Sequence, residues 1–418
     1  MADENGKAGY MLFRFSLYGF LKNQKYYEPF MILAFRDKGL SFFMIGLLIG
    51  FGKVCVNVFE IPTGVIADMY GRRKSMILSF CGYIAAFAVF ALSKMVWPLF
   101  AAMLLYSIGE SFRTGTHKAM IFDWLKRQGM EKQKTKYYGL TRSWSEMGSA
   151  LSVVIAAVIV LVSQNYNYIF WFSIIPYMAG LINFFGYPAY LDGEIETAAS
   201  LKATLVRLKQ TLVDLWRNRS LRRLFTESMT FKGSYTVTKE YLQPLLKQTA
   251  MALPFFTVFA ETKRSAILVG AVFFVLHLVS GYASRMSHTF SARSGGERQA
   301  SKWLWFVQGV LFAAMIPAFL YRIHWVAILA FVGVAVFQNT WRPILMSRID
   351  DCTDSKVGAT VLSLDSQLEA AFVMIAAPLI GYLVDLTGFW VVGTFGTASA
   401  IVGLLVLQNP IKRPSVNH

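Results

Sequence analysis

Ionisable side chains inside long apolar stretches carry most of the chemistry that this sequence suggests. Glu110, Arg113 and His117 stand at positions i, i+3 and i+7, a spacing that places them on one face of a helix. Asp365 and Glu369 are four residues apart and share a face in the same way. A charge inside an apolar helix is costly unless it has a partner or lines a polar pathway. These groups therefore predict a site that binds a charged solute or moves a proton.

The apolar stretches are long enough to cross a bilayer. The chain of 418 residues is 55% hydrophobic and only 16% charged, and the charges gather between apolar blocks. A helix needs about 20 mostly apolar residues to cross the hydrocarbon core. The fold class is therefore an all-α polytopic membrane protein with twelve transmembrane helices, which excludes a soluble enzyme, a disordered chain and a porin. The helices are expected at residues 11–36, 41–66, 76–95, 97–123, 138–163, 168–190, 222–246, 264–284, 302–321, 324–346, 358–385 and 388–408.

Positive charge predicts the orientation of these helices. Lys and Arg number 41 against 24 acids, a formal charge of +17. If the N-terminus is cytoplasmic, most basic residues fall in loops on that same side, notably within 72–74, 126–136, 202–223 and 285–302. Cytoplasmic loops of membrane proteins are rich in Lys and Arg. Both termini are therefore expected in the cytoplasm, and the basic face suits a lipid surface better than a nucleic acid.

The longest loop divides the chain into two halves. Residues 1–190 are expected to form an N-terminal six-helix bundle, and residues 222–418 a C-terminal six-helix bundle. Between them, leucines at helical spacing favour an amphipathic helix in a cytoplasmic linker, 191–221, that lies on the membrane or against protein. Weak similarities between the halves, such as Pro29 and Pro244 at matching points, indicate a duplication. Transporters built from such repeats bind substrate between them.

A glycine-containing loop after the second predicted helix is the most specific motif in the chain. It reads Gly64-Val-Ile-Ala-Asp68-Met-Tyr-Gly71-Arg72-Arg73-Lys74. Gly64 and Gly71 permit a close backbone approach and a tight turn. Asp68, at a helix end near the membrane surface, requires a cation or a helix N-terminus as its partner.

This motif resembles the loop signature of the major facilitator superfamily, and the twelve helices, the long central loop and the repeat fit the same family. The resemblance implies a conformational latch made of Gly64, Asp68, Gly71, Arg72, Arg73 and Asp123. In it, Asp68 would meet the start of the eleventh helix, and Arg72 would pair with Asp123. The latch would hold the cytoplasmic side closed and break when the transporter switches. Alternatively, these charges only fix the topology.

The resemblance also implies that the first, fourth, seventh and tenth helices line a substrate cavity. The candidate cavity residues are Lys25, Tyr27, Lys53, Arg113, His117, Lys232, Tyr235, Lys239, Gln243, Asn339 and Arg342. Cations outnumber acids among them, and unpaired buried cations would be unstable. An anionic or zwitterionic substrate follows from this excess. The alternative is that the cations pair with nearby acids in a structural network.

Five acids inside the predicted helices are candidates for proton coupling: Glu28, Glu110, Glu240, Asp365 and Glu369. A carboxylate binds a proton more readily in apolar surroundings and less readily beside a cation. A change of surroundings between two conformations can therefore load and release a proton. Each acid has a structural role as its alternative, and sodium is the alternative coupling ion.

Other functional classes receive less support. Three cysteines form no disulfide or metal pattern, and the chain contains no nucleotide-binding loop. We therefore expect no cofactor, no metal, no nucleic-acid partner and no enzyme activity. A polytopic membrane enzyme would need an interfacial cluster such as Glu110, His117 and Asp123, and it would have no reason to carry the repeat or the motif. A transporter-like receptor is the third class considered.

The predicted function is secondary active transport of a small solute by alternating access, with a proton as the coupling ion. The expected partners are the solute, the ion and the lipid bilayer, and the protein is expected to be a monomer in a bacterial inner membrane, as its short loops suggest. The alternative within the same fold is a drug or metabolite exporter that works as a proton antiporter. The fifth helix lacks the Gly- and Pro-rich signature of many such exporters and retains only Gly148.

Overall fold

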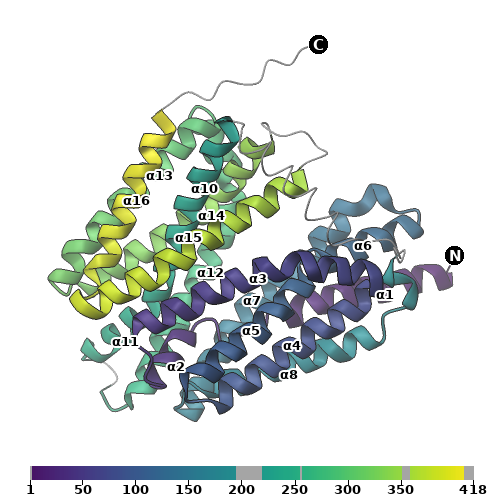
Figure 1. Cartoon of the computed structure of the whole chain (residues 1–418), viewed down its shortest axis with the longest axis horizontal. Coiled ribbons are helices and arrows are strands. Elements are labelled where there is room, and N and C mark those ends of the chain that lie inside the picture. Colours follow the sequence, from purple (N-terminus) through teal and green to yellow (C-terminus); the bar gives the residue numbers. More distant parts are fainter. Residues whose placement is uncertain (1, 194–218, 255–256, 351–357, 409–418) are drawn as a thin grey trace. The chain divides into compact units, whose positions relative to one another are not determined.

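The computed structural model describes residues 2–193, 219–254, 257–350 and 358–408, and every regular element within these ranges is a helix (Figure 1). Contacts divide the chain into two compact units. Unit 1 comprises Met1–Lys38, Cys55–Thr204 and Val258–Phe274, and unit 2 comprises Gly39–Val54, Leu205–Thr257 and Val275–His418. The predicted linker helix lies outside the described residues. The division into two bundles at 1–190 and 222–418 stays a prediction.

Unit 1 contains the helices of the first half of the chain. They are α1 (Ala2–Lys22), α2 (Met31–Asp37), α4 (Arg72–Leu92), α5 (Val96–Arg113), α6 (Thr116–Arg127), η1 (Glu131–Gln133), α7 (Lys134–Ser163), α8 (Tyr168–Phe185) and η2 (Ala189–Asp192). The long helix α3 (Phe42–Tyr70) begins in unit 2 and ends in unit 1. Aromatic side chains fill the space between α4 and α8, where the ring centres of Phe80 and Tyr177 are 5.5 Å apart.

Unit 2 contains most helices of the second half. They are α10 (Arg219–Thr238), η3 (Lys239–Tyr241), α11 (Leu242–Ala252), α13 (Glu297–Leu320), α14 (His324–Asp350), α15 (Gly358–Thr387) and α16 (Trp390–Gln408), whereas α12 (Glu261–Arg293) is divided between the units. Its apolar core holds Phe231 between two indole rings. The Phe231 ring stacks on Trp341 at 4.2 Å and meets Trp305 edge-on at 4.6 Å.

Nine of the described helices are long and apolar enough to cross a membrane: α3, α4, α7, α8 and α12 to α16. Large apolar side chains are exposed on them, for example Leu329 of α14 at 70% and Val162 of α7 at 74%. Such exposure would be unfavourable in water but is expected for surfaces that face lipid tails. The chain is therefore an integral, all-α membrane protein.

The other three predicted helices are interrupted, which corrects the sequence-based expectation. The first breaks at residues 23–30, the fourth at Thr114 and Gly115, and the seventh at η3. Proline cannot donate a backbone hydrogen bond, which accounts for breaks next to Pro29 and Pro244. Gly115 has a φ of +77°, a conformation that side chains with a Cβ rarely adopt. The breaks in the first and seventh helices fall at matching points of the predicted repeat.

These breaks change which residues share a helix face. His117 lies in α6, so it does not continue the face of α5 that carries Glu110 and Arg113. Gln243 lies in α11, beyond η3, so it does not continue the α10 stripe of Lys232 and Tyr235. The spacing argument fails at these two positions because it assumed an unbroken helical period.

Candidate functional site

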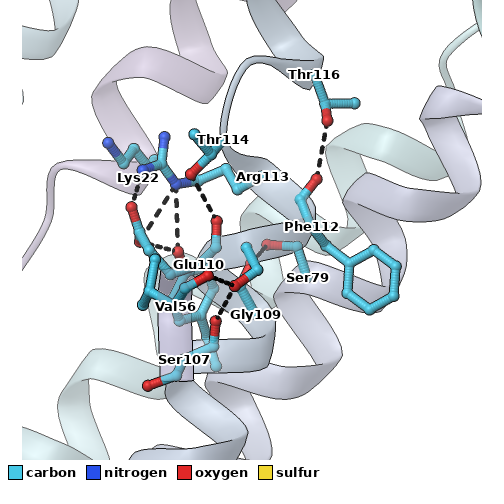
Figure 2. A network of polar contacts seen from close by, with 12 residues as sticks. Lys22, Val56, Ser79, Ser107, Gly109, Glu110, Phe112, Arg113, Thr114 and Thr116 are labelled. Atoms are coloured by element: carbon cyan, nitrogen blue, oxygen red, sulfur yellow. Dashed lines mark hydrogen bonds and ion pairs between the residues drawn. The ribbon is translucent and has the colours of Figure 1, made fainter. Parts of the chain in front are cut away.

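An ion pair at the end of α5 forms the centre of a polar cluster in unit 1 (Figure 2). Arg113 contacts the Glu110 carboxylate, one turn earlier on the same helix. Tyr83 of α4 donates its hydroxyl to Glu110 and accepts a hydrogen bond from Arg113 Nε at 3.2 Å. Lys22, the last residue of α1, lies beside this pair (Figure 2). Side-chain exposures of 18% for Arg113 and 25% for Glu110 show that the pair is mostly shielded.

Tyrosines extend the cluster toward the break in the first helix. The hydroxyls of Tyr27 and Tyr106 are 2.8 Å apart. The Tyr83 ring lies 5.2 Å from that of Tyr106 and 4.9 Å from that of Tyr177. The sequence pointed only to Tyr27, because tyrosines on apolar helices look like ordinary packing residues. Tyr27, Tyr83 and Tyr177 are buried and Tyr106 is half-buried, so these rings form a packed aromatic cluster with several hydroxyl groups beside the ion pair.

The charges of this cluster do not balance. Lys25 pairs with Glu28 at 3.5 Å, and Arg113 pairs with Glu110. Lys22 interacts electrostatically with all four of these groups. Three cations and two carboxylates leave a formal charge of +1 (3 − 2). The pairing supports the network alternative for two of the cations, while the cluster as a whole remains positive.

His117 packs among aromatic side chains and also interacts electrostatically with Arg113 and Lys22. Its ring stacks on Tyr18 with centres 3.7 Å apart, and its exposed fraction is 8%. Its Nε2 lies 3.4 Å from the Tyr187 hydroxyl. Such aromatic contacts suit a neutral imidazole that fills space between α1 and the end of α8.

A second charged network lies in unit 2. Lys232 of α10 contacts Glu369 at 2.5 Å and Asp365 at 3.7 Å, both on α15. Lys53 of α3 lies 3.7 Å from the other oxygen of Glu369, which also accepts a hydrogen bond from Thr236 at 2.9 Å. The formal charges of the two lysines and two acids cancel (2 − 2). The sequence placed four of these residues on three different helices, and the fold brings them together.

Asp365 is the least satisfied member of this network. Its side chain is only 5% exposed. One carboxylate oxygen faces Lys232, and the other, Oδ1, is buried without a hydrogen-bond partner among the described residues. A buried acceptor without a donor costs free energy, typically about 1–3 kcal/mol.

The remaining predicted cavity residues differ in their burial and in their contacts. Lys239 pairs with its neighbour Glu240 at 3.6 Å. Asn339 donates to a backbone carbonyl of its own helix, one turn earlier, at 2.8 Å. Gln243 is buried, Tyr235 is half-buried and Arg342 is exposed.

The motif loop is tied to the rest of unit 1. Arg72 forms an ion pair with Asp123 of α6. Arg73 donates its backbone N–H to the Asp192 carboxylate at 2.9 Å and its guanidinium to a carbonyl oxygen near the end of α8 at 2.9 Å. Asp68 is exposed. The sequence analysis did not identify Asp192, whose position after the sixth helix gave no signal.

Two buried arginines also escaped the sequence analysis. Arg348 Nη1 lies 2.7 Å from Glu227, and their side chains are 8% and 2% exposed. Arg14 is 9% exposed and donates from Nε to Asn183 at 3.1 Å and from its guanidinium to two carbonyl oxygens at the end of α8. A signal for Glu227 existed, because it is an acid inside the predicted seventh helix.

Comparisons with known proteins place this architecture among polytopic membrane transporters. In solved structures, 95% of this chain superposes on a nucleoside transporter, NupG, with a TM-score of 0.77, covering 98% of that chain at 12% identity. It superposes equally widely on a POT peptide transporter, with a TM-score of 0.71 at 15% identity and 93% of that chain covered. At these identities, the likeness shows the fold alone.

The sequence comparisons identify the family. The model of the Major Facilitator Superfamily matches residues 10–365, and the chain belongs to that superfamily. An uncharacterised MFS-type transporter, YxaM of Bacillus subtilis, is 29% identical over 101 residues, 24% of each chain. The multidrug resistance protein MdtH of Yersinia enterocolitica is 21% identical over 216 residues, 51% of this chain. The chain thus spans about a quarter and about half of the lengths of these relatives, at 24% and 49%.

Proposed function

We propose that this protein is a secondary active transporter that moves a small anionic or zwitterionic solute by alternating access, with a proton as the coupling ion. It would work as a monomer in a bacterial inner membrane. Membership of the superfamily supports the transport mode. The single observation that supports the substrate class is the positive cluster of unit 1, where three cations face two carboxylates.

A negatively charged group on the solute would complete this cluster. Lys22 is the cation in excess once Lys25 and Arg113 have paired with Glu28 and Glu110. A carboxylate, sulfonate or phosphate beside Lys22 would offset the cost of burying its charge. Tyr106, the half-buried tyrosine beside the cluster, would contact the same solute through its ring or its hydroxyl group.

A ligand screen on purified protein tests the substrate class. The thermal midpoint in detergent is measured with organic carboxylates, phosphates, zwitterions and organic cations, because a ligand that binds the folded state raises its stability by mass action. We expect anions or zwitterions to raise the midpoint of the wild type. Lys22→Gln should abolish that shift, and Lys94→Gln, at an exposed loop lysine, should retain it. Stabilisation by organic cations alone would contradict the proposal.

For proton coupling, we propose the network of Lys232, Asp365 and Glu369. Glu110 is held by an arginine and a tyrosine hydroxyl, which favour its charged form. Asp365, in contrast, has a buried oxygen without a donor among the described residues. A proton on Asp365 would change the network charge from 0 to +1 and leave Lys232 less compensated. Proton binding would thereby change the electrostatic balance inside unit 2, which is the kind of change that proton coupling requires.

Transport in proteoliposomes tests this coupling, with a solute taken from the ligand screen. For Asp365→Asn, we expect exchange of labelled for unlabelled solute to continue, while accumulation driven by a pH gradient is lost. Asp37→Asn, which removes an exposed acid outside the network, should keep both activities. Normal gradient-driven accumulation by Asp365→Asn would exclude Asp365 as the proton carrier.

Export of apolar drugs is the second candidate. It is supported by the similarity to a protein named for multidrug resistance. This function predicts that apolar cations, rather than anions, stabilise the protein in the same screen. It also predicts that Lys22→Gln leaves that stabilisation unchanged.

A further inference from the structure

The glycine and aspartate spacing of the motif loop occurs a second time, at the end of α15. The first copy reads Gly64-Val-Ile-Ala-Asp68-Met-Tyr-Gly71, and the second reads Gly381-Tyr-Leu-Val-Asp385-Leu-Thr-Gly388. Both copies end a long helix in the same way. α3 stops just before Gly71 and α15 just before Gly388, and the two glycines have φ values of +101° and +100°. The two copies are therefore alike in backbone conformation as well as in sequence.

In the second copy, Asp385 caps a helix that is far away in sequence. Its two carboxylate oxygens accept hydrogen bonds from the backbone N–H groups of Phe42 and Phe43, at 3.0 and 2.8 Å. These residues begin α3, where N–H groups have no partner within the helix. A carboxylate at this position also interacts favourably with the positive end of the helix dipole. Both oxygens of Asp385 thus hold α15 to the first turn of α3.

Glycines bring the two helices into close backbone contact next to this cap. A Cβ atom added at Gly381 would lie 2.3 Å from the carbonyl oxygen of Phe42. One added at Gly46 would lie 2.4 Å from the carbonyl oxygen of Ala377. Because backbone atoms cannot move aside as a flexible side chain can, larger residues would force these helices apart. The second copy is therefore engaged in this structure through both its glycine and its aspartate.

The first copy is not engaged in the same way. No described atom outside its own helix turn lies within 4 Å of a Cβ placed at Gly64. Asp68 is exposed, and among the described residues it makes no hydrogen bond or ion pair. The same spacing of residues is thus in tight contact at the end of α15, whereas the copy at the end of α3 makes no such contact with the part of the chain that the structure describes.

We infer that Gly381, Asp385 and Gly388 form an outer latch, which holds the non-cytoplasmic ends of α3 and α15 together in one state of the transport cycle and releases them in the other. The inference rests on the proposed alternating-access function and on the predicted orientation, which places the start of α3 and the end of α15 on the non-cytoplasmic side. Asp385 acts as a positioning residue, because it sets the balance between states without touching the solute. Each copy would thus stabilise closure of one side of the membrane.

Distance measurements between spin labels test the outer latch. Labels are attached to Lys94→Cys and Thr387→Cys in a chain whose native cysteines are replaced, and the protein is studied in lipid nanodiscs without solute. Both sites are exposed, and the predicted orientation puts each at a non-cytoplasmic helix end, Lys94 just after α4 and Thr387 at the end of α15. For Asp385→Asn, we expect a longer-distance population whose ratio to the shorter one rises at least about tenfold, as for loss of one charge-assisted hydrogen bond. Asp37→Asn, with an exposed acid on the same side, should match the wild type.

A second variant keeps the test independent of the carboxylate. Gly46→Ala leaves Asp385 in place but adds a Cβ atom that would lie too close to the carbonyl oxygen of Ala377. The two helices should therefore separate, and the same longer-distance population should appear. An unchanged distance distribution in both variants would overturn the outer latch. So would a lower thermal midpoint with an unchanged distribution, because that result describes a merely structural cap. Solute transport by the wild type is measured separately and tests the proposed function. If the wild type transports solute while both variants keep the wild-type distances, the latch is contradicted and the transport function is not.

Discussion

Removing the charge of Glu227 should destabilise unit 2 strongly. Its carboxylate is 2% exposed and lies 2.7 Å from Arg348, which also donates to Ser301 at 2.8 Å. Trp341 Nε1 donates to the same carboxylate oxygen at 3.3 Å. In Glu227→Gln, the amide keeps the volume but leaves the Arg348 guanidinium buried without an opposite charge. Removing one partner of a buried ion pair costs about 3–5 kcal/mol.

The size of this effect can be expressed as a melting temperature. For a unit of about 200 residues, each kcal/mol shifts the midpoint by about 2–4 °C, so Glu227→Gln should lower it by about 6–20 °C. The measurement is thermal unfolding in detergent, followed by loss of the monodisperse peak in size-exclusion chromatography. The matched control is Glu146→Gln. It breaks an ion pair of similar chemistry with Arg142 that is 65–66% exposed, and such pairs contribute less than about 1 kcal/mol.

A double variant separates the ion pair from general damage to packing. Glu227→Leu with Arg348→Met removes both charges and retains most of the volume, and apolar replacement of a buried pair is often neutral. We expect it to recover most of the lost midpoint, and the unpaired Trp341 Nε1 accounts for the remainder. The reasoning would be refuted if the midpoint of the double variant fell by the sum of the losses of the two single variants. A fall of less than about 2 °C for Glu227→Gln would refute it as well.

Three further predictions concern unit 1. Gly148→Ala should lower stability by about 1–3 kcal/mol, because its Cβ would lie 2.5 Å from the carbonyl oxygen of Phe20; Gly139→Ala, in the same helix with open space around it, should be neutral or stabilising in the same thermal assay. Arg14→Gln should lower the midpoint too, because two carbonyl oxygens at the end of α8 lose their donor. Burial lowers the pKa of Lys38, although Asp37 partly opposes this; NMR of ¹³C-dimethylated lysines should therefore show Lys38 losing its proton at a lower pH than exposed lysines.

The pattern of apolar blocks was sufficient to predict the helices but not their interruptions. Nine predicted spans appear as single long helices, because each one is a sustained apolar run. The break at Gly115 was not predicted, since a glycine inside an apolar stretch is compatible with a continuous helix. As a consequence, His117 does not share a continuous helix face with Arg113, and its ring stacks on Tyr18.

Candidate charges could be found from the sequence, but their partners could not. Lys53, Lys232, Asp365 and Glu369 were identified as costly residues inside apolar helices. Their meeting depends on how α3, α10 and α15 pack, which the spacing within one helix does not contain. Glu227 escaped notice because its partner is more than a hundred positions away and lies near a helix end, where a charge has little cost.

The sequence by itself determined that this protein is a helical membrane protein of the major facilitator type, because length, apolarity, loop charge and the motif are local properties of the chain. Only the tertiary structure decided which charges neutralise one another and which copy of the glycine–aspartate spacing is engaged. Both depend on distances between residues that are remote in sequence. At the contact between Asp385 and the start of α3, more than 340 positions of chain separate the two partners.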